Sequence, residues 1–305
     1  MTDINAAIAE YLELRRRLGF KLEEAGRLLP DFARYAERRE ATAITTELAL
    51  AWAAQPGFSP ERIADRLSAV RLFAVHLQAV DPTVEVPPAD LVIAHRRRVT
   101  PHLFSRADVA AILAATTIID PPLAAATFAT LIGLLAVSGL RLGEALRLDR
   151  TDVDFDTAAL TIRLTKFNKT REVPLHPSAV DALAAYDRQR ALVFPAASWF
   201  FASATGARLS HNAVYPVFAR LLDAADIHAL PRARRPRPHD LRHSFAVETV
   251  TGWYRDGGDV EARLPLLSTY LGHLEPVSTY WYLSATPELL SLAARRLEAD
   301  RAVTP

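Results

Sequence analysis

The sequence contains no cysteine among its 305 residues. This absence excludes disulfide frameworks, thiolate metal sites and cysteine nucleophiles, and it suits a reducing compartment, so we expect a cytoplasmic protein. Half of the residues are hydrophobic, which predicts an ordinary soluble globular chain, long enough for two domains and a sizeable core. Internal repeats and low-complexity segments are absent too.

An excess of charge of either sign is also missing. The 36 lysines and arginines nearly balance the 35 aspartates and glutamates, and the net charge is +1. Such a balance gives no general attraction to nucleic acid, so any DNA-binding surface must be a local patch. Three basic stretches are candidates, at 15–17, 96–98 and 231–243. Alone they do not predict DNA binding, because runs of basic residues more often belong to a solvated surface.

No targeting or membrane segment is evident. The N-terminus, MTDINAAIAEYLELRRR, has no apolar core followed by a cleavage site, so no secretory signal is predicted. Residues 121–140 carry no charge and approach the length of a membrane span. They open with two prolines, are rich in alanine, threonine and glycine, and run directly into Arg141. This pattern favours a helix buried inside a domain, and no membrane partner is expected.

Two domains joined by a linker are predicted. Cap signals and apolar periodicity indicate helices at 5–18, 22–38 and 46–54, and a longer one that starts at Ser59, Pro60 and Glu61. Residues 81–101 then combine prolines with an arginine triplet and show no helical period. We therefore expect a helical N-terminal domain at 1–90, a linker at 91–102 and a second domain at 103–305.

The second domain is predicted to be mainly α with a small antiparallel β-sheet. Ser105 and Asp108 form a capping box for a helix at 106–115. Strands are expected at 151–155, 159–164 and 171–175, with a turn near 167–170. The remaining helices are expected at 123–137, 141–148, 178–192, 212–225, 240–253, 261–270 and from 286 to about 300.

Five short stretches of the sequence contain residues suited to binding and attacking one phosphodiester. They are Arg141 in SGLRLGEAL, Lys166 in TKFNKTREVPL, His239 and Arg242 in HDLRH, His273 in LGH, and Tyr282 in STYWYL. Planar guanidinium groups hold phosphate oxygens bidentately, and a tyrosine hydroxyl can act as the nucleophile. Because a phenol has a pKa of about 10, its attack near neutral pH needs a proton acceptor or a strongly cationic pocket.

In this order the strings resemble the tyrosine recombinase (phage integrase) family, in detail from about residue 104 to 290. The stretch SPERIADRLSAVRLFAVHL is similar to the end of that family's N-terminal core-binding domain. The resemblance implies a two-domain DNA clamp, in which a helical core-binding (SAM-like) domain precedes the catalytic domain. It also implies the active-site set Arg141, Lys166, His239, Arg242, His273 and Tyr282.

The implied activity is site-specific recombination of double-stranded DNA. Tyr282 would form a 3′-phosphotyrosyl intermediate, with no cofactor and no metal, as in integration, excision or transposition of a mobile element. The resemblance further implies a homo-tetramer on DNA and leaves open whether related recombinases act with it. The sequence departs from the family's pattern in two places. The turn TKFNKT lacks the glycines often found there, and Arg242 and His273 are farther apart in the sequence than is usual. We expect a glycine-containing loop at 253–262 to account for that separation.

Several alternatives stay open. Lys169 competes with Lys166 as the general acid, and Tyr280 competes with Tyr282, although the spacing favours Tyr282. The stretch HDLRH is also similar to the zinc-binding pattern HExxH, but the positive charge of Arg242 would repel a bound cation. The competing functions are type IB topoisomerase-like DNA relaxation, a non-catalytic DNA-binding accessory protein and, less favoured, a zinc hydrolase.

Overall fold

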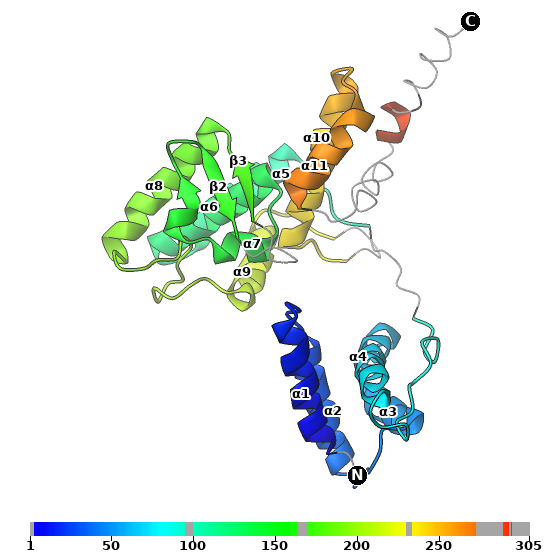
Figure 1. Ribbon diagram of the computed structural model, residues 1–305. Helices are drawn as coiled ribbons and strands as arrows, with labels where there is room; N and C mark the ends of the chain where they lie inside the picture. Colours follow the sequence, from blue (N-terminus) through cyan, green and yellow to red (C-terminus); the bar gives the residue numbers. More distant parts are fainter. Residues whose placement is uncertain are drawn as a thin grey trace, which may run out of the picture. The chain divides into compact units, whose positions relative to one another are not determined.

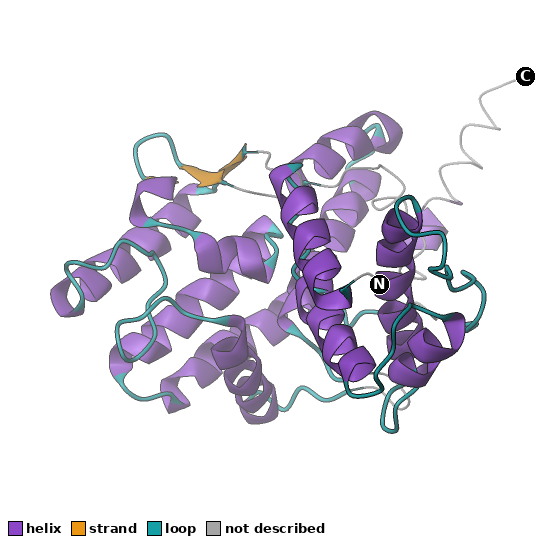
Figure 2. Cartoon of the chain, turned by 60° about the horizontal axis from the view of Figure 1, so that its bottom comes forward, coloured by secondary structure: helices purple, strands orange, loops and turns teal. Residues whose placement is uncertain are grey.

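The chain divides into two compact units, Met1–Arg98 and Val99–Pro305 (Figure 1). The computed structural model describes residues 3–94, 100–163, 170–229, 234–272, 289–292 and 294. Helices dominate both units, and one small antiparallel sheet is present (Figure 2). The predicted fold class is therefore confirmed. Over these described ranges, no helix combines the length and apolarity that crossing a membrane requires.

Over residues 3–94, the first unit folds into four helices around its own core. They are α1 (Ile4–Arg17), α2 (Ala25–Glu37), α3 (Thr46–Ala53) and α4 (Pro60–Gln78). Asp3, Thr45 and Ser59 cap α1, α3 and α4 by accepting backbone N–H groups of the first turn. The apolar faces of the helices enclose Phe32, Trp52 and Phe73, which are completely buried. Burial of such large side chains makes this unit self-contained.

The second unit is arranged around α6 (Pro122–Ser138), the charge-free helix. It packs against α5 (Arg106–Ala115), α8 (Pro177–Val193) and α10 (Pro238–Arg255). Leu131 and Leu135 of α6 are fully buried within the main core of this unit. The prediction of a core helix rather than a membrane span is confirmed. The same unit also contains α7 (Leu142–Arg147), α9 (His211–Ala224) and α11 (Val260–Leu271).

The sheet contains three short strands in chain order, β1 (Val153–Asp154), β2 (Ala159–Ile162) and β3 (Arg171–Pro174). Leu160 lies opposite both Val153 and Val173, and all three side chains are buried against the core. At the end of the ladder Ile162 lies opposite Arg171. In the sequence, Lys166 lies between these two paired residues, in a stretch outside the described residues.

Several predicted boundaries were wrong, and two of them have a clear local cause. Residues 151 and 152 belong to a 3-10 turn (Arg150–Asp152), because the Asp152 carboxylate accepts the backbone N–H of Asp149 at 3.0 Å and bends the chain before β1. The loop expected at 253–262 is limited to residues 256–259, since α10 continues to Arg255 and Asp259 caps α11. Most of the helix predicted from 286 to 300 lies outside the described residues, although residues 289–292 are helical.

Candidate active site

The first turn of α10 carries two of the predicted site residues. Asp240 accepts the backbone N–H of Arg237 at 2.8 Å, and Pro238 occupies the first turn, so the start of the helix is well defined. His239 and Arg242 are three positions apart and therefore share one face of α10. The spacing in HDLRH thus brings an imidazole and a guanidinium together at a helix start.

Arg242 is buried, with 2% of its surface exposed, and is bound to two helix ends. Its Nη1 donates to the carbonyl of Gly139 at 2.7 Å, and its Nη2 donates to the carbonyl of Leu271 at 2.8 Å. Gly139 is the C-cap of α6, and Leu271 is the last residue of α11. Carbonyl groups at helix C-termini carry partial negative charge, which stabilises a buried cation and orients its plane.

Arg141 is the N-cap residue of α7 and reaches the same end of α11. Its Nη1 donates to Glu144 Oε1 at 2.9 Å, its backbone N–H donates to Glu144 Oε2 at 3.0 Å, and its Nη2 donates to the carbonyl of Gly272 at 3.0 Å. Because Leu271 and Gly272 are adjacent, the structure brings Arg141 and Arg242 together. The Arg141 side chain keeps 34% of its surface exposed, so part of it remains open to solvent.

The buried carboxylate of Glu144 binds a second arginine that the sequence analysis missed. Arg171 donates from Nη1 and Nη2 to the two carboxylate oxygens at 3.1 and 2.8 Å, and from Nε to the carbonyl of Tyr270 at 3.0 Å. One signal was available in the sequence. Arg171 shares the buried face of β3 with Val173 by the two-residue period of a strand, and a charged side chain on a buried face requires a partner.

Glu144 is held in its charged form. Burial raises its pKa, but hydrogen bonds and charge from Arg171, together with those from Arg141, outweigh burial and lower the pKa to about 2. One carboxylate therefore fixes two guanidinium groups at neutral pH. With Arg242, the cluster contains three arginines around one acid, an arrangement that attracts an anion.

His239 is uncharged at neutral pH in this setting. Burial lowers its pKa, and the charges of Arg242, Arg237 and Arg141 lower it further, to about 4, against a weaker opposing effect of Glu144. A neutral imidazole has one nitrogen that accepts a hydrogen bond or a proton. Among its described residues, the site therefore combines fixed cations with a proton acceptor, His239.

The other predicted site residues, Lys166, His273 and Tyr282, lie outside the described residues, as do their competitors Lys169 and Tyr280. Their roles stay predictions. The residue before His273 is described, however, and it lies within the arginine cluster. Gly272 adopts a φ of +67°, and a Cβ at this position would lie 2.8 Å from Nη1 of Arg171. Only glycine combines this left-handed conformation with so close a contact.

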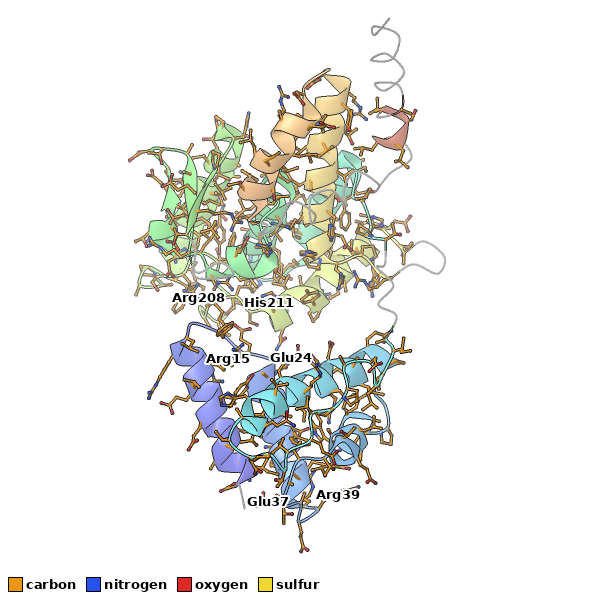
Figure 3. The ribbon with its side chains drawn as sticks, turned by 45° about the vertical axis from the view of Figure 1, so that its right-hand side comes forward. Arg15, Glu24, Glu37, Arg39, Arg208 and His211 are labelled. Carbon is orange, nitrogen blue, oxygen red and sulfur yellow. The ribbon has the colours of Figure 1, made fainter. Side chains whose placement is uncertain are left out.

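Further basic side chains lie beside α7. Arg208 donates to the carbonyl of Leu146 at 3.3 Å, and a Cβ on Gly143 would lie 3.0 Å from Nε2 of His211. Figure 3 shows Arg208 and His211 along the same edge of the second unit. Arg208 also donates to the Asp149 carboxylate at 2.6 Å, so an acidic group compensates its charge.

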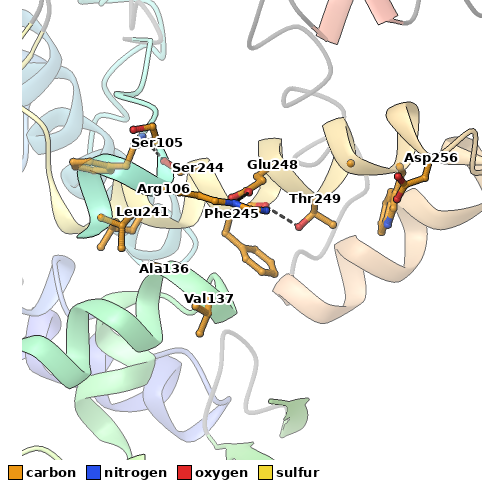
Figure 4. Close-up of a pocket in the computed structure, with 14 residues that line it drawn as sticks. Ser105, Arg106, Ala136, Val137, Leu241, Ser244, Phe245, Glu248, Thr249 and Asp256 are labelled. Atoms are coloured by element: carbon orange, nitrogen blue, oxygen red, sulfur yellow. Dashed lines mark hydrogen bonds and ion pairs between the residues drawn. The ribbon is translucent and has the colours of Figure 1, made fainter. Parts of the chain in front are cut away.

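A separate pocket lies on the other face of α10 (Figure 4). Its volume is about 580 Å³, and it is lined by Leu241, Phe245 and Glu248 of α10 together with residues of α5 and α6. Arg106 donates to Glu248 at 2.6 Å across it. None of the described arginines in the cluster lines this pocket. Within the described part of the chain, no group of three or more His, Asp or Glu side chains is placed to hold a metal ion.

Comparison with known proteins identifies the family. The model of the phage integrase family matches residues 104–288. The chain belongs to this family. Two Sinorhizobium fredii (strain NBRC 101917 / NGR234) proteins whose names describe an integrase/recombinase are similar over nearly the whole chain. The protein y4rB is 43% identical over 98% of both chains, and y4rE is 38% identical over 96% of this chain and 95% of its own.

Other relatives are named tyrosine recombinases. XerD of Rhizobium meliloti (strain 1021) is 30% identical over 95% of this chain and 94% of its own. Among solved structures, the Tn1549 transposon integrase in complex with transposon right end DNA superposes with a TM-score of 0.66 over 98% of this chain and 99% of that one, at 18% identity. This likeness shows a shared fold. The chain is thus a tyrosine-type recombinase of the phage integrase family, and the resemblance stated from the sequence is confirmed.

Proposed function

We propose that this recombinase cuts and rejoins double-stranded DNA at specific sites through a covalent bond to Tyr282. One observation supports the proposal most directly. Three arginines, Arg171, Arg242 and Arg141, donate to the carbonyls of residues 270, 271 and 272 in turn. These carbonyls form the end of α11, and the next residue in the chain is His273. Arg141 and Arg242, two of the predicted site residues, therefore meet at the stretch of chain that immediately precedes His273.

Arg141 and Arg242 would hold the scissile phosphate. When an oxygen attacks phosphorus, negative charge grows on the nonbridging oxygens, and guanidinium groups already fixed in place stabilise that charge without reorganisation. Arg141 is the more accessible of the two and would contact the phosphate from solvent. The buried Arg242 would supply charge from beneath it, and the proposed role of His273 is to donate a further hydrogen bond.

Proton transfer accompanies the attack. The Tyr282 oxygen would form a bond to phosphorus while its proton passes towards the neutral His239, and the bond from phosphorus to the 5′ oxygen would break. Lys166, or Lys169 in its place, would protonate that leaving oxygen as a general acid. The products are a 3′-phosphotyrosyl link and a 5′ hydroxyl. A 5′ hydroxyl from a partner duplex would then reverse the step, so each phosphate bond broken is replaced by another.

The partners follow from this chemistry. We infer that the first unit, at about 1–90, is the core-binding domain and that residues 103–305 form the catalytic domain, so that both contact the duplex. Strand exchange joins two cut duplexes and would engage four copies of the chain, a homo-tetramer on DNA. Two similar recombinases occur in one Sinorhizobium fredii strain, which favours action together with related recombinases. Movement of a mobile element is the expected setting.

The test uses a duplex isolated from a random-sequence pool by its affinity for the full chain. A nick placed close to the cleavage position lets a short fragment diffuse away, which traps the covalent adduct. We expect wild type to form this adduct and Tyr282→Phe to form none, while both bind the duplex equally well. Denaturing gel electrophoresis measures the adduct.

Tyr280→Phe is the matched control, since it removes a phenolic oxygen two positions away. It should form the adduct at a rate close to that of wild type. An adduct formed by Tyr282→Phe and lost in Tyr280→Phe would move the nucleophile to Tyr280. Absence of any adduct in wild type on a tightly bound duplex would favour the non-catalytic accessory protein.

A further inference from the structure

Arg171 lies at the junction of the proposed acid-bearing hairpin and the phosphate clamp. It is the first residue of β3 and pairs with Ile162 at the last step of the β2–β3 ladder. The eight residues between them include Lys166 and Lys169. No other described residue of the ladder reaches both α7 and α11 through side-chain hydrogen bonds.

We propose that Arg171 is a positioning residue that holds the base of the lysine-bearing hairpin against the active-site arginines. The inference rests on the proposed function, because it assumes that a lysine of this hairpin protonates the leaving 5′ oxygen. The contacts that carry it come from three elements. Arg171 of β3 binds both oxygens of Glu144 on α7 and the carbonyl of Tyr270 on α11.

The shared carboxylate makes this link rigid. Glu144 is 3% exposed, and the same two oxygens that bind Arg171 also accept from Arg141. A bidentate pair fixes orientation as well as distance. Removing Arg171 would release the end of the ladder from α7, whereas Arg141 would keep its own hydrogen bonds to Glu144 and Gly272.

Burial argues against a direct contact between Arg171 and DNA. Its side chain is 14% exposed, compared with 34% for Arg141. It also packs against Gly272, where a Cβ would lie 3.0 Å from its Cζ. Arg171 therefore lies beneath the groups that would meet the phosphate and acts on the reaction through them.

A change of leaving group tests this role. If Arg171 places the general acid, its loss should slow departure of the 5′ oxygen but not departure of sulfur, because a thiol has a pKa of about 8.5 and leaves without a proton donor. The substrates are two nicked duplexes of the sequence selected above, one normal and one with sulfur as the 5′-bridging atom. We expect Arg171→Gln to form the adduct about 100-fold more slowly than wild type on the normal duplex. On the sulfur duplex its rate should lie within about threefold of wild type.

Arg150→Gln is the matched control, because it removes another bidentate arginine, bound to Asp187 at 3.0 and 2.8 Å in the same unit. It should cleave both duplexes at wild-type rates. Arg171→Lys retains the charge but not the fork, so a smaller loss with the same rescue by sulfur is expected. This variant also provides the test if Arg171→Gln fails to fold.

Two results would overturn the inference. Equal losses on the two duplexes would assign Arg171 to the clamp or to general stability, and an undiminished rate on the normal duplex would leave it without a role in the step. The proposed function is tested separately by Tyr282→Phe. An adduct in that variant refutes Tyr282 as the nucleophile, whereas its absence together with a fully active Arg171→Gln refutes only the role of Arg171.

Discussion

Arg242 and Arg141 are the same type of residue, but their side chains differ greatly in exposure to water. Burying a guanidinium costs several kcal/mol unless hydrogen bonds replace its hydration. For Arg242 the carbonyls of Gly139 and Leu271 supply two of these bonds at helix ends. Arg141 instead shares the Glu144 carboxylate and stays partly exposed. The same residue type thus serves as a fixed internal charge in one place and as an accessible contact in the other.

The titration of His239 gives a prediction at the scale of one residue. In the DNA-free protein its imidazole should stay uncharged from pH 8 to about 5 and gain a proton near pH 4, because burial and neighbouring arginines lower its pKa. Nuclear magnetic resonance of the imidazole Cε1 proton, assigned by its loss in His239→Gln, measures this midpoint. A bound phosphate should raise the midpoint by offsetting the arginine charges. A midpoint close to 6.5 without DNA would contradict the buried, cationic setting described here.

The same shift affects stability in a definite direction. Above pH 6.5 both the folded and the unfolded chain contain neutral His239, so the shift has no effect. As the pH falls from 6.5 towards 4, the unfolded chain takes up the proton first, and the folded state loses stability. Glu144 acts at lower pH, because its stabilising charge is lost as the pH falls from 4.5 towards 2.

The sequence analysis identified the charged residues that lie in short local motifs, but it missed Arg171, whose partners are distant in the sequence. His239 and Arg242 are three positions apart, so helical geometry alone places them on one face. Arg141 and Glu144 are likewise three positions apart and form an ion pair. Arg171 binds Glu144 across 27 positions of sequence, and its other partner is a backbone carbonyl. No local spacing encodes contacts of that kind, so only the assembled fold reveals them.

At the scale of elements, the junction of α6 and α7 determines where two arginines lie. Gly139 ends α6 with a φ of +59°, and a Cβ there would lie 2.5 Å from Cδ1 of Phe245. Its carbonyl also accepts from Arg242. A side chain at this position would therefore strain the turn and shift a group that orients the site.

We expect Gly139→Ala to lower the free energy of unfolding of the second unit by about 2 kcal/mol or more, from the left-handed backbone and the clash together. Gly133→Ala is the control in the same helix, because a Cβ there meets nothing within 4 Å. That change should stabilise α6 by up to about 1 kcal/mol. Urea unfolding of both variants measures the difference. Equal stabilities would show that the turn tolerates a side chain and that the contacts of Gly139 are not restrictive.

Elements with strong local signals were predicted well. The helix at 106–115 matches α5 in both bounds, because its capping box is present in the structure. The first strand was predicted to begin at residue 151 but begins at Val153. Alternating apolar residues at 151–155 do not reveal that Asp152 closes a 3-10 turn. The glycines at 257 and 258 do mark a connection, but helix caps on both sides limit it to four residues, 256–259.

At the scale of the whole molecule, each unit has its own hydrophobic core. The cluster of the first unit draws on side chains from residues 4–92, and the two clusters of the second unit draw on residues 103–289. No cluster of the described residues contains side chains from both units. Apolar burial within each unit is the main stabilising contribution to folding, so fragments 1–98 and 99–305 should each fold when expressed alone, as circular dichroism would show.

The two fragments allow the proposed clamp to be tested through salt. Each phosphate contact releases counterions, so the affinity of a protein that uses both units should fall more steeply with salt than that of either fragment. Linking two weak binders also makes the second contact intramolecular, which raises the affinity of the full chain by about 10²-fold or more. Fluorescence anisotropy with the selected duplex, from about 50 to 200 mM salt, measures both effects. If fragment 99–305 matched the full chain in affinity and in salt slope, the first unit would make no contact with DNA. The arginines of the second unit would then have to supply the whole interface.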